Sequence, residues 1–201
     1  MIHRIALALV LWMLFLGAVP LAAQTSSAGI SENPRVEVSV GYSYVRARTV
    51  IPTGCCFNMN GGSASGAFNV NSWLGIAGDF GGYYTGNVRN SGFSLEVFSY
   101  TFGPRISIRR RRVTPFAQAL FGGGHAGDTL YTVGFQQGSA PPTARNSFAM
   151  VLGGGLDVNV SRHIAIRAAQ ADWLYTQFPN GVDNRQNNLR ITAGIVFRFG
   201  G

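Results

Sequence analysis

The stretch Leu189-Arg190-Ile191-Thr192-Ala193-Gly194-Ile195-Val196-Phe197-Arg198-Phe199 decides the fold class of this chain. Its odd-numbered positions are all apolar, whereas its even-numbered positions include Arg190 and Arg198. A helix would place these two arginines among the apolar residues, but an extended strand sends them to the opposite face. The period of two therefore predicts a β-strand with one bulky apolar face and one small, sparsely charged face.

The same alternation recurs along the chain between clusters of Gly, Asn, Ser and Pro. Residues 163–176 need a β-bulge near Ala168-Ala169 to keep the phase. That bulge would send Arg167, Gln170 and Asp172 to the same side. With the closing stretch, the pattern predicts eight strands, at residues 35–45, 64–71, 73–84, 98–108, 113–124, 148–158, 163–176 and 189–199.

Composition narrows the protein class. Charged residues make up 12% of the 201 residues, about half of the roughly 25% usual in soluble domains. Low charge with 14 Phe and 7 Tyr excludes a disordered chain, and two cysteines exclude a disulfide-rich mini-protein. All 16 basic residues are arginine, and the net charge is +8. Because these arginines are scattered, no nucleic-acid partner is expected.

The N-terminal segment predicts export from the cytoplasm. Residues 1–23 have a short positive start, an apolar run and a small-residue exit at Ala22-Ala23, which is typical of a cleavable signal peptide. A membrane-spanning helix needs about 20 apolar residues, and this run is shorter and meets Pro20. We therefore expect a signal peptide at 1–23, a periplasmic lead at 24–34 and a β-barrel at 35–199.

Three observations place the bulky apolar face against lipid. The other face carries small residues that suit a narrow interior, and its charges balance, as buried charges must. These charges are Glu37, Asp79, Asp157 and Asp172 against Arg105, Arg167, Arg190 and Arg198. Aromatic residues also gather at the strand ends, as in the girdles of membrane barrels. One girdle would contain Tyr42, Tyr44, Tyr83, Tyr84, Trp173 and Tyr175, and the other Trp73, Phe197 and Phe199.

The physics of the bilayer then fixes the architecture. Sheets survive in hydrocarbon only as closed barrels, because every backbone polar group needs an internal partner. The connections between the predicted strands alternate between short and long, as in outer-membrane barrels. We therefore expect an all-β, eight-stranded antiparallel up-and-down transmembrane barrel with a plugged polar interior. It would lie as a monomer in the outer membrane of a Gram-negative-type bacterium, in contact with lipid and lipopolysaccharide.

The chain resembles the small eight-stranded outer-membrane barrels of the OmpA-like transmembrane domain family over nearly all of 35–199. The residues that carry the resemblance are 73–80, 114–123, 148–157 and 189–199. The resemblance implies a barrel delivered by the barrel assembly machinery, which reads a terminal aromatic residue. Here Phe199 is followed by Gly200-Gly201, which displaces that signal by two residues.

Other motifs point only weakly to chemistry. Residues 122–127 fit a G-x-G-x-x-G pattern, but no helix pattern follows, as a dinucleotide site requires. Cys55 and Cys56 can form a disulfide in an oxidising compartment. Some barrels of this kind are lipid-acting hydrolases that use serine and histidine, and Ser161 with His163 is the local candidate here. The run Arg109 to Arg112 is either a solvated turn or a contact for phosphates.

The expected function is therefore structural or surface interaction: membrane integrity, adhesion or recognition of an extracellular ligand through the long loops. No catalytic, cofactor-binding or metal-binding residue is expected. A narrow pore or a barrel that carries a small ligand is the alternative, and a lipid-acting hydrolase is a third, weaker one.

Overall fold

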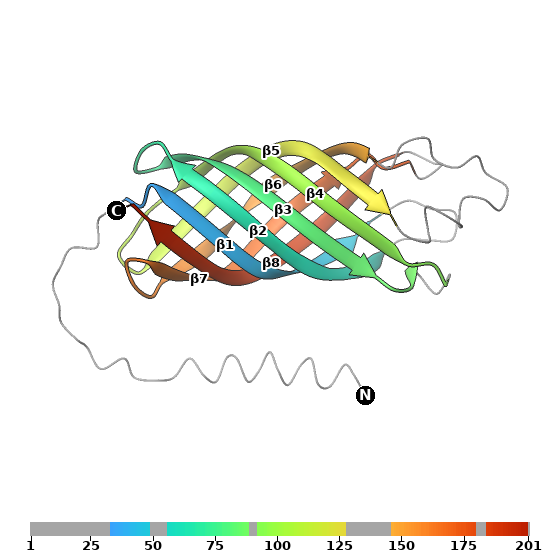
Figure 1. The fold of residues 1–201 in the computed structure, drawn as a ribbon, viewed down its shortest axis with the longest axis horizontal. Helices are drawn as coiled ribbons and strands as arrows, with labels where there is room; N and C mark the ends of the chain where they lie inside the picture. Colours follow the sequence, from blue (N-terminus) through green and yellow to red (C-terminus); the bar gives the residue numbers. More distant parts are fainter. Residues whose placement is uncertain (1–32, 49–55, 89–91, 128–145, 180–183, 201) are drawn as a thin grey trace, which may run out of the picture.

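The computed structural model describes residues 33–48, 56–88, 92–127, 146–179 and 184–200. Within them, eight antiparallel strands close into one barrel (Figure 1). The strands are β1 (Val36–Ala47), β2 (Phe57–Asn69), β3 (Leu74–Thr85), β4 (Leu95–Ser107), β5 (Val113–Gly127), β6 (Asn146–Asn159), β7 (Ile164–Thr176) and β8 (Gln186–Phe199). The prediction of an eight-stranded up-and-down barrel is confirmed. The predicted signal peptide and most of the lead lie outside the described residues.

The barrel closes where β8 pairs with β1, from Val36 opposite Phe199 to Arg46 opposite Leu189. Every strand therefore has a partner on both sides, which is the condition for a sheet in hydrocarbon. No helix in the described ranges is both long and apolar enough to span a bilayer.

The two ends of the barrel differ. Short connections at 70–73, 108–112 and 160–163 lie at the end where both ends of the described chain meet, and there the backbone N–H of Arg35 donates to the carbonyl of Gly200 at 3.3 Å. Figure 1 shows this end on the left and the opposite end, where β1, β3, β5 and β7 end, on the right. We call these the turn end and the loop end.

The strands are longer at the loop end than the sequence predicts. β2 begins at Phe57 instead of residue 64, β6 at Asn146 and β8 at Gln186. The missed part of β2 has Asn58, Asn60 and Gly62 on its outer face, so hydrophobic alternation is absent there. This part of β2 is still a strand, because its backbone pairs with β1 as far as Phe57 opposite Ala47.

The predicted bulge in β7 is confirmed. Arg167 pairs with Gly194 and Gln170 with Thr192, so three residue steps on β7 face two on β8. Ala168 and Ala169 both point outward, and the side chains of Arg167, Gln170 and Asp172 are all buried. One extra residue thus keeps both halves of β7 in phase with the lipid.

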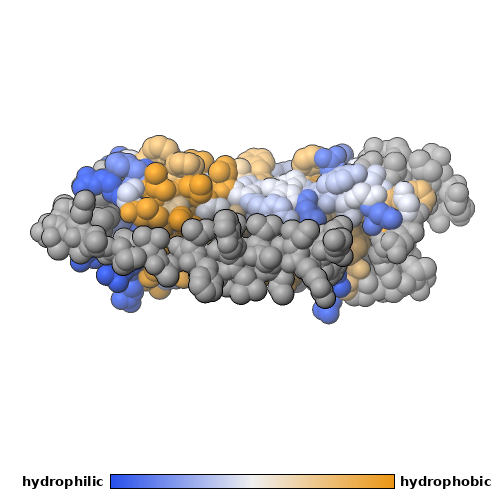
Figure 2. All heavy atoms as spheres, turned by 90° about the horizontal axis from the view of Figure 1, so that it is seen from below, coloured by the Kyte–Doolittle hydropathy of each residue, from blue (hydrophilic) through white to orange (hydrophobic). Residues whose placement is uncertain are grey.

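The outer wall is apolar, as predicted. Most exposed large side chains of the barrel belong to Val, Ile, Phe, Leu, Tyr and Trp. On the face shown in Figure 2, hydrophobic residues form an orange band nearer the turn end, with blue hydrophilic residues beyond it and paler residues toward the loop end.

The interior corrects one expectation, because part of it is apolar. The predicted charges are buried in the half nearer the turn end and around the middle. Nearer the loop end the interior contains an apolar cluster, which includes Val45, Met59, Val97, Leu120, Val151 and Leu174. Three hydrogen-bonded polar side chains of β7 and β8 are buried at the same end: Thr176, Gln186 and Asn188.

Candidate functional site

Arg190 on β8 is the centre of the polar half of the interior. Its side chain is 0% exposed and contacts carboxylates from two other strands. Its Nη1 lies 2.6 Å from Asp79 on β3, and its Nη2 lies 2.7 Å from Asp172 on β7. The Nη1 group also donates to the hydroxyl of Tyr83 at 2.8 Å. One guanidinium thus connects β3, β7 and β8 across the barrel, using the several donors of its planar fork.

A second arginine extends this network toward the turn end. Arg167 on β7 makes a two-point contact with Asp157 on β6, at 2.8 and 3.2 Å. Its Nη1 donates to the hydroxyl of Ser39 on β1 and to the amide oxygen of Gln170. The Gln170 amide nitrogen in turn donates to Asp172 at 2.7 Å. Gln170 therefore joins the two ion-paired clusters into one.

The third cluster lies nearest the turn end and contains Glu37 on β1. Arg198 lies 3.1 Å and Arg109 3.7 Å from its carboxylate. Burial lowers the pKa of the Arg109 guanidinium, which the Glu37 carboxylate opposes, and the group stays charged at physiological pH. Arg109 comes from the β4–β5 turn, so this run of arginines sends its first member toward the interior.

Arg105 on β4 differs from the other buried arginines. In the described part of the chain no carboxylate pairs directly with it. Instead it donates to the amide oxygen of Gln118 at 2.7 and 3.1 Å, and the Gln118 nitrogen donates to Asp172 at 3.4 Å. Two guanidinium groups lie over the Phe116 ring, that of Arg105 at 4.8 Å and that of Arg167 at 4.5 Å from the ring centroid. Such cation–π contacts stabilise charges away from water.

The structure brings all eight predicted charges into the interior, but not as four simple pairs. Asp79 and Asp172 share Arg190, while Glu37 is shared by Arg198 and Arg109. Sequence reasoning missed Phe116, Gln118 and Arg109 as members of this network, whereas the predicted bulge had already placed Gln170 on the side of Arg167 and Asp172. Phe116 and Gln118 share the inward parity of Thr114, so the period-two pattern of β5 carried the signal.

Tyr83 was assigned to an aromatic girdle, and the structure contradicts this. It is 1% exposed and lies inside the barrel, because it has the same parity as Asp79. The other residues predicted for the two girdles face outward. Tyr42, Tyr84 and Trp173 are exposed near the loop end with Tyr44 and Tyr175 half-buried beside them, and Trp73, Phe197 and Phe199 are exposed near the turn end.

The sequence over residues 11–199 matches the family described as outer membrane protein beta-barrel domain. The chain belongs to that family. It therefore resides in the outer membrane, where barrels carry short periplasmic turns and longer extracellular loops.

Solved outer-membrane barrels have the same fold. Ail, the attachment invasion locus protein of Yersinia pestis, is 20% identical with a TM-score of 0.55, over 84% of this chain and 100% of Ail. Neisserial surface protein A is 16% identical with a TM-score of 0.61, over 82% and 97%. OprG from Pseudomonas aeruginosa is 9% identical with a TM-score of 0.56, over 85% and 98%. No curated protein matches the sequence.

The remaining sequence motifs of this outer-membrane barrel have local structural roles. The Ser161 hydroxyl accepts the backbone N–H groups of His163 at 3.3 Å and Ile164 at 3.1 Å, which closes the β6–β7 turn. The glycines at 122–127 lie within β5. Cys56 is disulfide-bonded, and Cys55 lies outside the described residues. In those residues no three His, Cys, Asp or Glu side chains gather as a metal site would require.

Proposed function

We propose that this protein is a monomeric, closed outer-membrane barrel that acts through its surface: in membrane integrity, in adhesion, or in recognition through its extracellular loops. The observation that carries the proposal is the two-layer interior. An ion-paired layer crosses the barrel at Arg190. An apolar layer around Leu120 and Leu174 packs nearer the loop end. Eight strands leave an interior that side chains can fill.

The solved relatives support a surface role. One is the attachment invasion locus protein of Yersinia pestis, and another is Neisserial surface protein A. The long connections at the loop end would contact an extracellular ligand, and parts of them, residues 49–55, 89–91, 128–145 and 180–183, lie outside the described residues.

We further propose that the outward aromatic residues mark the two membrane interfaces. The polar tips of two of them have partners nearer the loop end: the Tyr42 hydroxyl donates to Asn60 at 2.6 Å, and the Trp173 indole donates to Asn187 at 3.1 Å. An aromatic ring with one apolar and one hydrogen-bonding end suits the headgroup region. Delivery to this position would use the barrel assembly machinery.

Conductance in a planar bilayer tests the closed state. The purified barrel should insert without giving stable single-channel openings, because both interior layers are filled. A reproducible open level of nanosiemens size would overturn the proposal in favour of a pore. Membrane fractionation with a heat-modifiable gel shift supplies the control that the inserted protein is a folded outer-membrane barrel.

A further inference from the structure

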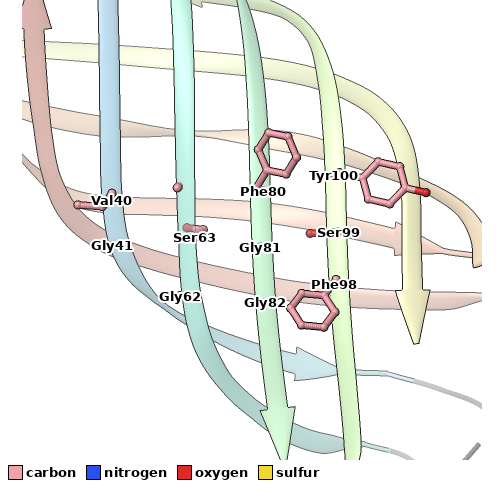
Figure 3. A pocket seen from close by; sticks show the side chains of 11 residues that line it. Val40, Gly41, Gly62, Ser63, Phe80, Gly81, Gly82, Phe98, Ser99 and Tyr100 are labelled. Carbon is pink, nitrogen blue, oxygen red and sulfur yellow. The ribbon is translucent and has the colours of Figure 1, made fainter. Parts of the chain in front are cut away.

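The outer wall carries a groove over β1 to β4. Its volume is about 440 Å³. Small residues form the floor: Gly62 and Ala64 on β2 and Gly82 on β3. Val40 on β1 forms one side, and the rings of Phe80, Phe98 and Tyr100 form the other (Figure 3). Phe80 is 66% exposed, so it stands well above this floor.

The outward residues of β1 beside the groove change in character along the strand. Val36, Val38 and Val40 are apolar, Tyr42 and Tyr44 follow, and exposed Arg46 stands nearest the loop end. The same order holds on β2, where the glycine and alanine floor leads to two asparagines. Asn60 accepts from the Tyr42 hydroxyl at 2.6 Å, and Asn58 accepts from Arg46 at 2.5 Å. Apolar, aromatic and cationic zones thus follow one another from mid-barrel to the outer surface.

We propose that this groove is a binding site for one lipopolysaccharide molecule of the outer leaflet. An acyl chain would lie over Gly62 and Ala64, and a phosphate on the glucosamine backbone would be bound by Arg46. A guanidinium hydrogen-bonded to an anionic oxygen makes one of the stronger polar contacts, and the adjacent amides offer partners to the sugar. The inference rests on the outer-membrane location and is independent of whether the interior conducts.

Charge favours this occupant over a second copy of the barrel. Among the described contacts, the exposed Arg46 guanidinium is bound by the neutral amide oxygen of Asn58 and by no carboxylate, so an anionic occupant would supply the opposite charge that Arg46 lacks. The described residues that line the groove carry no acidic side chain that a second copy could offer in return. A phosphorylated amphiphile supplies both the anion and the apolar tail.

Native mass spectrometry of the full barrel in detergent tests the site with three probes: bisphosphorylated lipid A, its dephosphorylated form and phosphatidylglycerol. We expect one lipid A per barrel. Arg46→Gln should weaken the binding of bisphosphorylated lipid A at least about tenfold, which is the loss expected for one charge-assisted contact. It should leave the binding of the dephosphorylated lipid unchanged. Ala64→Leu, which fills the floor, should weaken both lipid A forms.

Matched changes elsewhere on the exposed surface provide the controls. Ala171→Leu makes the same change on β7, on the opposite wall, and Arg110→Gln removes an exposed arginine at the turn end; both should bind lipid A as the unaltered barrel does. Each variant must show the heat-modifiable gel shift of a folded barrel. The proposal is overturned if Arg46→Gln binds normally, if phosphatidylglycerol binds as tightly as lipid A, or if Ala64→Cys cross-links two barrels.

Discussion

Arg190 is the residue on which the interior depends, and its two carboxylates are not equivalent. Asp79 accepts from Arg190 alone among the described contacts. Asp172 accepts from Arg190, from Gln170 at 2.7 Å and from Gln118 at 3.4 Å. Gln118 also joins Asp172 to Arg105 by hydrogen bonds. Losing Asp172 therefore leaves more buried donors without acceptors than losing Asp79.

This difference predicts an order of stability. Asp79→Ala should lower the free energy of unfolding by about 3 kcal/mol, because Arg190 keeps its second partner. Asp172→Ala should lower it by about 4–5 kcal/mol, since two amides lose an acceptor as well. Urea unfolding of the refolded barrel, followed by gel mobility, measures both. An unaltered urea midpoint for Asp79→Ala would contradict the inward placement of this carboxylate.

The sequence could predict which charges lie inside, but not how they pair. Side-chain direction in a strand follows position parity, so the face of Asp79 or Arg190 is a local property. Their contact joins residues 111 positions apart and depends on the register of every strand between them. Tyr83 shows that position parity also decides the face of an aromatic residue. Its residue type suggests a girdle, but its odd position, like that of Asp79, sends its ring inside.

At the scale of the strand, β7 shows how one extra residue is accommodated. Arg167 and Gln170 are three positions apart, yet they face residues only two apart on both neighbours: Gly194 and Thr192 on β8, and Asp157 and Gly155 on β6. The sequence predicts this bulge because the isoleucines before it and the tryptophan after it have opposite parity. The sequence does not predict the early start of β2, because the outer residues there are polar and the apolar alternation is absent.

Deleting Ala168 should therefore be tolerated. The shortened β7 would regain a regular two-to-two register with both neighbours while Arg167, Gln170 and Asp172 stay inside. Deleting Ala171, another exposed alanine of the same strand, would turn either Gln170 or Asp172 toward lipid and break the polar network. Gel mobility before and after heating compares the two. A folded barrel without Ala171 and none without Ala168 would contradict this view of the bulge.

For the molecule as a whole, the two interior layers do different work. The apolar layer supplies burial of the kind found in a soluble core, whereas the charged layer connects strands that are not neighbours in the sheet. The apolar outer wall gains no hydrophobic free energy from packing against protein, because lipid tails are as apolar as a protein core. The interior contacts and the completed strand ladder therefore hold the closed form.

Closure of the ladder depends on the seam between β1 and β8, where Gly41 and Gly194 pair directly. A Cβ on Gly194 would collide with the backbone of Val40 and Gly41, and neither can move without opening the seam. Gly194→Val should therefore abolish the heat-modifiable form. Gly66→Val is the matched control, since a Cβ there has nothing within 4 Å, and it should fold normally. If both variants shift on heating as the unaltered barrel does, the seam tolerates a side chain and closure does not depend on this pair.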